Sequence, residues 1–505
     1  MNRKTSIENI AMILALATII SKILGLMREL VVAYRFGAGS ITDAFVLTNG
    51  IPSMIFVSIG TAININYIPY YQKLKDKEEQ NQFTSNLLNI IIVILLVGCL
   101  FVNIFPKFVL NIFAVGLPDE TKHYAVVMLR IVMFSIIPII VAHLFQAYSQ
   151  ANGQFITTAL FGIVTNVVII ITTFLSTEKN YWFLSVGTIM ANAAGMIMIV
   201  WGTGKIGFQY CSIFDPFNKQ IKTLIFLTLP LMVENIASSM SLIVDRNLAS
   251  FLESGTISGL SYAGLLGNIA GTMISNSIIT ATFPSFSRLL ASGNKDKFEE
   301  SFKKYGNVML FLLCPMAMVM IFYAKDIVIF VFQHGVFSSD ASKIVWESMA
   351  CYAIGIIPSG MQTYLIRVFY ALQDTKTPVK IKVFALLCNI ALNFAAVFRW
   401  RHIGIAMSTS ISFIISYILL AYFLTGRYGF ASVKSITKRM LVGILLSIIP
   451  AALSFILFNY CIQIEELFLK LVLELSVFII CYFGAFGITN QKMVKEAADI
   501  LKGRF

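Results

Sequence analysis

The chain has 505 residues, of which 58% are hydrophobic and only 12% charged, and its formal net charge is +13. Soluble domains carry roughly a quarter charged residues. The apolar residues form unbroken runs of about 20, such as 87–105, the length that a helix needs to cross a bilayer. A transmembrane β-barrel alternates apolar and polar residues instead. Composition therefore excludes a soluble enzyme, a barrel and a disordered scaffold, and it predicts an all-α polytopic membrane protein.

Apolar runs separated by charged or Gly/Pro-marked breaks predict about 14 transmembrane helices. An even number places both termini on one side of the membrane. Lys and Arg are concentrated in loops on the side of the N-terminus, which predicts cytoplasmic termini, and we attribute the net charge to topology, not to nucleic-acid binding. The predicted helix centres lie near residues 20, 56, 95, 135, 164, 192, 236, 270, 318, 358, 389, 413, 449 and 476.

A weak internal repeat predicts two lobes of six helices. When Gln150 is laid on Gln373, the same offset places Asn166 on Asn389 in the following helix. Parallel repeats of this kind occur in transporters, although unrelated apolar helices also resemble one another by chance. The predicted parts are an N-terminal lobe at 1–215, a C-terminal lobe at 216–430 and a final helix pair with a basic tail at 431–505.

The first predicted helix carries Lys22, Arg28 and Glu29 deep within its apolar run. A cation at mid-bilayer costs about 2.5–3.5 kcal/mol on insertion scales, so it is kept where it is paired, reaches the interface or faces a wet cavity. Pairing of Arg28 with Glu29, Asp43 or Glu234 is one interpretation, and a cationic cavity for an anionic substrate is the other. The predicted substrate-binding residues are Lys22, Arg28, Glu29, Asp43, Asn49, Asn64 and Arg246.

A second polar group predicts a site for a coupling ion. Asn389 and Asn393 are four residues apart and share a helix face, and Asp245 and Thr409 lie in other predicted spans. Carboxylate, amide and hydroxyl oxygens suit a hard cation such as Na⁺. Interhelical hydrogen bonding of buried Asn residues is the alternative. No other cofactor is expected.

Two further segments favour structural roles. Glu466, Lys470 and Glu474 follow one another at every fourth position, so we expect them to neutralise each other. The segment 373–378 predicts a tight cytoplasmic turn, with Pro378 in the first turn of the next helix. The chain has no GxxxxGK[ST], HExxH or GxSxG motif, so neither ATP hydrolysis nor hydrolase chemistry is expected.

The segments SKILGLMRE at 21–29 and FGAGSITDAF at 36–45 resemble the opening signature of the MurJ (MviN) lipid II flippases. Other segments fall in the family's order and spacing: DRNLASFL at 245–252, FPSFS at 283–287, QHGVF at 333–337 and QDTKTPV at 373–379. This resemblance implies 14 helices in two lobes, a central cavity between helices 1, 2, 7 and 8, and a hydrophobic groove by helices 13 and 14.

The resemblance also implies roles for single residues. Arg28 matches an essential arginine of the first helix, Lys22 stands for another arginine and Glu29 for an aspartate. Asp43 matches the aspartate of a TDAF motif. The four predicted cation ligands fall where some relatives look to hold Na⁺, with Asn393 in place of an aspartate. Two features depart from the family: 51–69 lacks an arginine, and Gly264 stands in an expected Ala-Asp/Asn-Arg-Leu motif.

The function implied is movement of lipid II, an undecaprenyl-pyrophosphate-linked peptidoglycan precursor, from the inner to the outer leaflet of the bacterial cytoplasmic membrane. The implied mechanism is ion-coupled alternating access. The expected partners are the lipid-linked substrate, membrane lipids and cell-wall synthesis proteins. Three alternatives stay open: export of another lipid-linked glycan such as a capsule or exopolysaccharide unit, antiport of amphipathic cations, and an inactive scaffold for glycan-synthesis enzymes.

Overall fold

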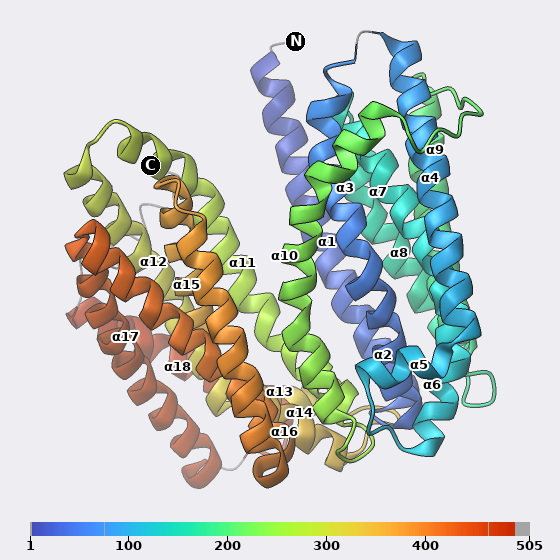
Figure 1. Ribbon diagram of the computed structural model, residues 1–505. Helices are drawn as coiled ribbons and strands as arrows, with labels where there is room; N and C mark the ends of the chain where they lie inside the picture. Colours follow the sequence, from blue (N-terminus) through green and yellow to red (C-terminus); the bar gives the residue numbers. More distant parts are fainter. Residues whose placement is uncertain (1–2, 75, 463, 490–505) are drawn as a thin grey trace. The chain divides into compact units, whose positions relative to one another are not determined.

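The computed structural model describes residues 3–74, 76–462 and 464–489, and this part of the chain is helical, with no β-strand (Figure 1). The all-α membrane fold predicted from the sequence is confirmed. The chain divides into two compact units: residues 1–258 with 335–337, and residues 259–334 with 338–505. The lobe boundary near residue 215 was inferred from a repeat and not from contacts. It stays a prediction.

The first unit contains ten α-helices, two short irregular helices and the first residues of α11. Their bounds are α1 (Arg3–Phe36), α2 (Ser40–Pro52), η1 (Ser53–Val57), α3 (Ser58–Tyr71), α4 (Lys77–Ile104), α5 (Pro106–Phe113), α6 (Asp119–Val132), η2 (Met133–Ser135), α7 (Ile136–Ala151), α8 (Ile156–Leu175), α9 (Phe183–Lys205) and α10 (Lys219–Ala249).

The second unit contains most of α11 and the remaining helices. Their bounds are α11 (Thr256–Ala291), α12 (Lys295–Phe322), α13 (Ala324–Phe332), α14 (Ser339–Ile354), α15 (Ile356–Ala371), α16 (Lys376–Tyr428), α17 (Ala431–Ile456), η3 (Leu457–Cys461) and α18 (Leu467–Thr489). Arg401 interrupts α16 with φ 48° and joins two helices across a kink. The kink separates the spans predicted near residues 389 and 413.

Every predicted span centre lies within a helix. Within the described residues, 8 helices are long and apolar enough to cross a membrane, or 10 if each of two bent pairs is one span. The kinked α16 covers two predicted centres. The centres near 20, 56 and 236 fall in α1, η1 and α10, where charges or a π-helical break interrupt the apolar run. The number of 14 spans stays a prediction.

The internal repeat is visible in the helix boundaries at an offset of 220 residues, not the 223 predicted. Helix α7 begins Ile-Ile-Pro at Ile136, and α15 begins Ile-Ile-Pro at Ile356. The turns after them also match, because Gly153 and Gln373 both have positive φ, of 77° and 59°. Asn166 and Asn389 are therefore offset by nearly one helical turn. Short polar motifs fix a register less securely than helix ends do.

Small residues bring the helices of the first unit close together. A methyl group on Gly162 of α8 would overlap Ser21 Oγ of α1, and one on Gly187 of α9 would overlap Thr172 Oγ1 of α8. Helices within a membrane associate through such close backbone approach, because lipid provides no hydrophobic drive between them. Helices α1, α8 and α9 therefore pack closely side by side, with α8 in the middle.

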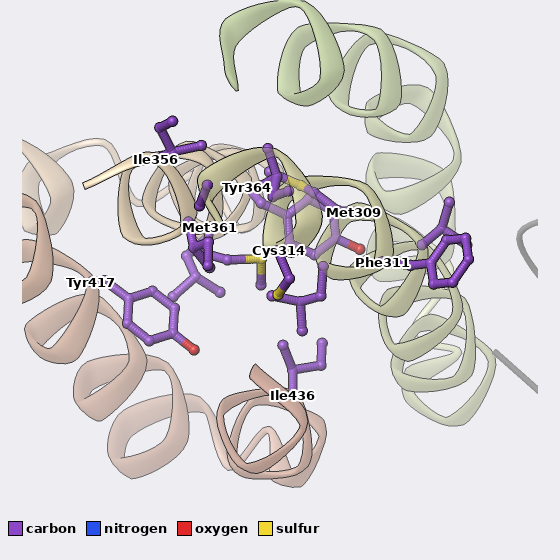
Figure 2. Packing of buried hydrophobic residues seen from close by; sticks show 14 of the residues in the cluster. Met309, Phe311, Cys314, Ile356, Met361, Tyr364, Tyr417 and Ile436 are labelled. Carbon is purple, nitrogen blue, oxygen red and sulfur yellow. The ribbon is translucent and has the colours of Figure 1, made fainter. Parts of the chain in front are cut away.

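The second unit has an aromatic and aliphatic core (Figure 2). Phe302 and Tyr364 stack with ring centroids 4.9 Å apart, and the Tyr364 hydroxyl donates to the Phe302 carbonyl at 2.9 Å. Phe286, within the FPSFS motif, packs on both rings. That motif therefore serves the packing of α11 against α12 and α15. Burying the Tyr364 hydroxyl costs little free energy because it has a hydrogen-bond partner.

The QDTKTPV motif is the tight turn that its composition predicts. Asp374 accepts hydrogen bonds from the Thr377 amide at 3.0 Å and hydroxyl at 2.7 Å, and from the Tyr428 hydroxyl at 2.8 Å. Arg427 lies 3.3 Å from the same carboxylate. Burial raises the pKa of Asp374, but these hydrogen bonds and the Arg427 charge outweigh it, so the pKa lies below the ordinary 3.8.

Acid should therefore weaken this turn. A carboxylate whose pKa is lowered by folding contributes stability that is present above 3.8 and is lost as pH falls from there through the folded pKa. We expect Asp374→Asn to remove this part of the acid dependence and to cost about 0.5–1.5 kcal/mol at neutral pH. The Asn amide keeps an acceptor for the Thr377 N–H but loses the Oδ2 acceptor of the Thr377 and Tyr428 hydroxyls and the charge facing Arg427. Thermal unfolding in detergent across the acid range measures both. The exposed Asp340 is the control, and equal acid profiles for Asp374→Asn and wild type would contradict the expectation.

Candidate functional site

Arg28 is held on α1 by two partners. Its Nε donates to Glu29 Oε1 at 3.1 Å, its Nη2 pairs with the same oxygen, and its Nη1 donates to Asn166 Oδ1 of α8 at 3.3 Å. The Arg28 side chain is nonetheless 34% exposed. A cation that is both oriented and accessible is suited to bind an anion, because part of its hydrogen-bonding capacity is free for a ligand.

Asn166 fixes the position of α1 as well as that of Arg28. Its Nδ2 donates to the Ser21 carbonyl at 3.0 Å, while its Oδ1 accepts from Arg28. Gly25 lies between these two contacts, and a methyl group there would be in ordinary van der Waals contact with the Asn166 amide, at 3.7 Å. One amide therefore ties two levels of α1 to α8. Lys22 is exposed and extends the positive charge along the helix.

Asp43 has a structural position. The buried carboxylate accepts from the Ser258 amide at 2.7 Å, the Ser258 hydroxyl at 2.6 Å and the Gly255 amide at 2.6 Å. These groups form the start of α11, whose unpaired N–H groups and dipole favour a negative charge. Gly255 has φ 91°, and a side chain there would also meet the Ala38 carbonyl. The TDAF aspartate thus ties α2 to the start of α11.

The QHGVF motif closes the same region of the first unit. The Val336 amide donates to the Tyr34 carbonyl near the end of α1 at 3.2 Å. Gly335 has φ 64°, and a methyl group there would lie 2.7 Å from the Tyr34 ring. The motif therefore satisfies a carbonyl that the end of α1 leaves open.

Arg246 lies on α10 directly against Gly50 of α2. A methyl group on Gly50 would overlap Nη1 and would lie 2.7 Å from Cζ. Among the described residues, no hydrogen-bond partner is present for the buried Nε and Nη1 atoms of Arg246, nor for Asn49 Oδ1 in the same turn of α2 as Gly50. An unpaired buried donor costs about 1–3 kcal/mol. The side chain of Asn64 lies outside the described residues.

Three of the four predicted cation ligands meet on α16. Asn389 Nδ2 donates to Thr409 Oγ1 at 3.4 Å, and Asn393 Nδ2 donates to Asn389 Oδ1 at 3.3 Å. The kink at Arg401 folds the two halves of α16 so that these residues face each other. The fourth predicted ligand, Asp245, belongs to the first unit. The cation site stays a prediction.

A family model described as lipid II flippase MurJ matches residues 32–479. This chain belongs to the MurJ family. Two curated relatives are the probable lipid II flippase MurJ of Thermotoga maritima and the lipid II flippase MurJ of Thermosipho africanus. The first is 26% identical over 407 residues, 80% of this chain and 83% of the relative. The second is 27% identical over 413 residues, 82% and 84% of the two chains.

Solved structures agree with this assignment. The lipid II flippase MurJ in an inward closed conformation superimposes with a TM-score of 0.82 at 25% identity, over 96% of this chain and 100% of that one. An inward-facing multidrug resistance MATE transporter of the MOP superfamily reaches 0.69 at 12% identity, over 82% and 96%. The second likeness concerns the fold alone. The family predicted from the sequence motifs is confirmed, and the chain is a multi-pass membrane protein.

The MurJ motifs contain one residue of each arginine and aspartate contact described above, but they miss the partners Asn166 and Gly50. They contain Arg28 with Glu29, Asp43 and Arg246. Asn166 was singled out only as part of a repeat, and its bonds to Arg28 depend on how α8 packs. Gly50 gives no sequence signal for its contact with Arg246, because a glycine in an apolar helix is common.

Proposed function

We propose that this protein is a flippase that moves lipid II, or a close lipid-linked relative, across the bacterial cytoplasmic membrane. The observation that carries the proposal is Arg28, an accessible cation fixed on α1 by Glu29 and Asn166 in a chain of the MurJ family. A polyprenyl pyrophosphate needs cations for its headgroup and lipid for its tail. The work on such a substrate is transport, with no bond made or broken.

In this proposal Lys22 and Arg28 hold the pyrophosphate, while Glu29 keeps Arg28 oriented. Asn49 and Asn64 of the α2–α3 segment meet the sugar and peptide. The tail lies along α17 and α18. Helix α17 presents an exposed apolar stripe at every fourth residue, from Leu441 through Leu445 and Ile449 to Leu453, and such a face suits lipid chains.

Rescue of bacteria depleted of their lipid II flippase tests the substrate. Under the proposal, the wild-type gene restores growth and cell shape, and purified protein in vesicles moves fluorescent lipid II between leaflets. Rescue of a capsule or exopolysaccharide export defect, without rescue of lipid II flipping, supports the alternative substrate. The reduced arginine set, with none in 51–69 and Gly264 in α11, favours that alternative over an antiporter of cations.

We propose that both termini are cytoplasmic, on the strength of the Lys and Arg bias of the loops. Arg427 to Arg439 would then face anionic lipid headgroups and the enzymes that make the precursor. The basic tail Lys492 to Arg504 lies outside the described residues. Reporter fusions after Phe505 that are active only in the cytoplasm test this orientation. An inactive scaffold would share the topology and partners but would leave lipid II in the inner leaflet.

We propose Na⁺ as the coupling ion, bound by Asp245, Asn389, Asn393 and Thr409. The cluster of Asn389, Asn393 and Thr409 supports this with amide and hydroxyl oxygens, and Asp245 adds one negative charge, which suits a monovalent ion. We expect Asp245→Asn to abolish Na⁺ dependence and to slow flipping at least tenfold, a loss of about 1.4 kcal/mol. Flipping rates in vesicles with Na⁺ or choline measure this. If Asp245→Asn leaves the flipping rate and its Na⁺ dependence unchanged, the Na⁺ site is wrong and these residues serve only helix packing.

A further inference from the structure

Arg246 carries hydrogen-bonding capacity that the described chain does not use. Its Nε and Nη1 atoms are buried and have no acceptor, although the residue as a whole is partly exposed. The guanidinium stays charged at any physiological pH, and buried donors are almost always paired. An acceptor from outside the chain would complete this environment, and the partial exposure of the residue lets one approach.

Gly50 makes the position of this guanidinium possible. Any side chain at residue 50 would occupy the place of Nη1, and its Cβ would lie 2.7 Å from Cζ. Gly50 is not among the glycines with positive φ, so the backbone of α2 does not require glycine here. The missing side chain therefore serves the arginine, which lies against the helix backbone.

Gly50 also lies at the depth of Arg28. Eight residues separate Arg28 from Phe36 at the end of α1, and ten separate Gly50 from Ser40 at the start of α2. The chain reverses direction between these helices (Figure 1). At about 1.5 Å per residue, Arg28 and Gly50 are roughly 12 and 15 Å from the connecting turn. Arg246 of α10, which lies against Gly50, thus brings a cation to the level of Arg28 from a helix other than α1.

We propose that Gly50 and Arg246 form a second anion-binding subsite, which takes a phosphate group of the lipid-linked pyrophosphate. This inference rests on the proposed function. A pyrophosphate carries charge on both phosphates, whereas the two cations assigned to it above, Lys22 and Arg28, both lie on α1. Arg246 contributes N–H donors of fixed geometry, which suit phosphate oxygens better than a lysine does. Gly50 is a positioning residue: it touches the guanidinium and not the ligand.

The test is a calorimetric titration of the full-length protein in detergent with inorganic pyrophosphate, which measures the binding affinity. We expect Arg246→Gln to weaken binding about tenfold, as for loss of a charge-assisted hydrogen bond. Gly50→Ala keeps the charge but displaces the guanidinium, so we expect it to weaken binding several-fold. The double variant should bind no more weakly than Arg246→Gln alone, because both changes remove one interaction.

Two controls match these changes. Gly39→Ala is the same substitution at the start of α2, where a methyl group meets no atom within 4 Å. Arg130→Gln removes an exposed cation from the last turn of α6. Both should bind pyrophosphate as the wild type does. Equal losses in the controls would assign the effects to general stability or net charge and would overturn the subsite.

The outcomes separate this subsite from the proposed function. If Arg246→Gln and Gly50→Ala bind as wild type does while Arg28→Ala loses binding, the subsite is wrong and the flippase proposal stands. If Arg246-dependent binding is seen for phosphatidylglycerol in nanodiscs but not for pyrophosphate, the acceptor is a membrane-lipid phosphate and the subsite is overturned. If the Arg28 variant still flips lipid II, the headgroup proposal fails, and the pyrophosphate titration still decides on Gly50 and Arg246.

Discussion

Replacement of Arg28 by alanine should abolish lipid II flipping while the protein still inserts at normal levels. Insertion should not suffer, because removing a cation from α1 relieves about 2.5–3.5 kcal/mol of membrane-insertion cost. Binding should suffer, because losing one partner of a desolvated ionic contact costs about 2–5 kcal/mol, or a factor of roughly 30 to several thousand. Arg28→Lys should retain part of the activity, since it keeps the charge without the planar donor geometry.

Flipping of fluorescent lipid II in vesicles measures this, with membrane levels checked by immunoblot. Arg130→Ala is the matched control, since Arg130 is exposed at the end of α6. Glu29→Gln separates the two roles of Arg28. If the arginine served only its ion pair with Glu29, both variants would lose the same activity. Wild-type flipping by Arg28→Ala would refute the anion-binding role.

Replacement of Lys470 by methionine should destabilise the second unit by about 3–5 kcal/mol, the usual cost of breaking a buried ion pair. Lys470 Nζ lies 2.7 Å from Asp326 Oδ2 of α13 and 3.7 Å from Glu474 Oε1, and it donates to Asn459 Oδ1 at 2.8 Å. Its side chain is 14% exposed, and that of Glu474 is fully buried. Without the lysine, two carboxylates would be left without a cation.

Glu474→Gln should behave differently. Among the described residues no donor meets the buried Oε2 atom of Glu474, and Lys470 keeps its closer partner Asp326 when residue 474 is neutral. Removing the Glu474 charge should therefore leave the protein as stable as wild type or more so. Thermal unfolding in detergent measures both variants. Lys343→Met is the control, because Lys343 is 65% exposed and 3.9 Å from Glu347, where a pair contributes about 0–1 kcal/mol. Two results would contradict this account. One is a Lys470→Met protein with the same unfolding temperature as Lys343→Met, and the other is a Glu474→Gln protein destabilised as much as Lys470→Met.

The comparison of Glu466 with Asp326 shows where sequence reasoning stops. The four-residue spacing predicts that Glu466 and Glu474 neutralise Lys470, and Glu474 does approach it. Glu466 contributes only its carbonyl, to the Lys470 amide, while Asp326, 144 residues away, supplies the closest carboxylate. Spacing within one helix is readable from sequence, whereas partners on other helices depend on packing. Asn166 was missed as the partner of Arg28 for the same reason.

The fold was more predictable than the site. Runs of apolar residues are long and redundant, so each predicted span centre falls in a helix even though single boundaries shift. A break between the spans centred near 389 and 413 could be predicted because charged residues interrupt the apolar run there, whereas its form, a kink at Arg401 within α16, could not. The contact of Gly50 with Arg246 could not, because it depends on the absence of a side chain. A glycine whose role is to leave space for another side chain has no functional group that a sequence pattern could reveal.

The pairing of Arg28 with Asn166 has a consequence for biosynthesis. The two residues are separated by 138 positions, and at about 5–20 residues per second the ribosome needs roughly 7–28 s to make the second after the first. During that interval α1 is in the translocon or the bilayer with a cation and no α8 to hold it. The bond from Arg28 to Asn166 can form only after α8 has been made, so until then Glu29, the next residue along the chain, is the partner that this cation has within α1.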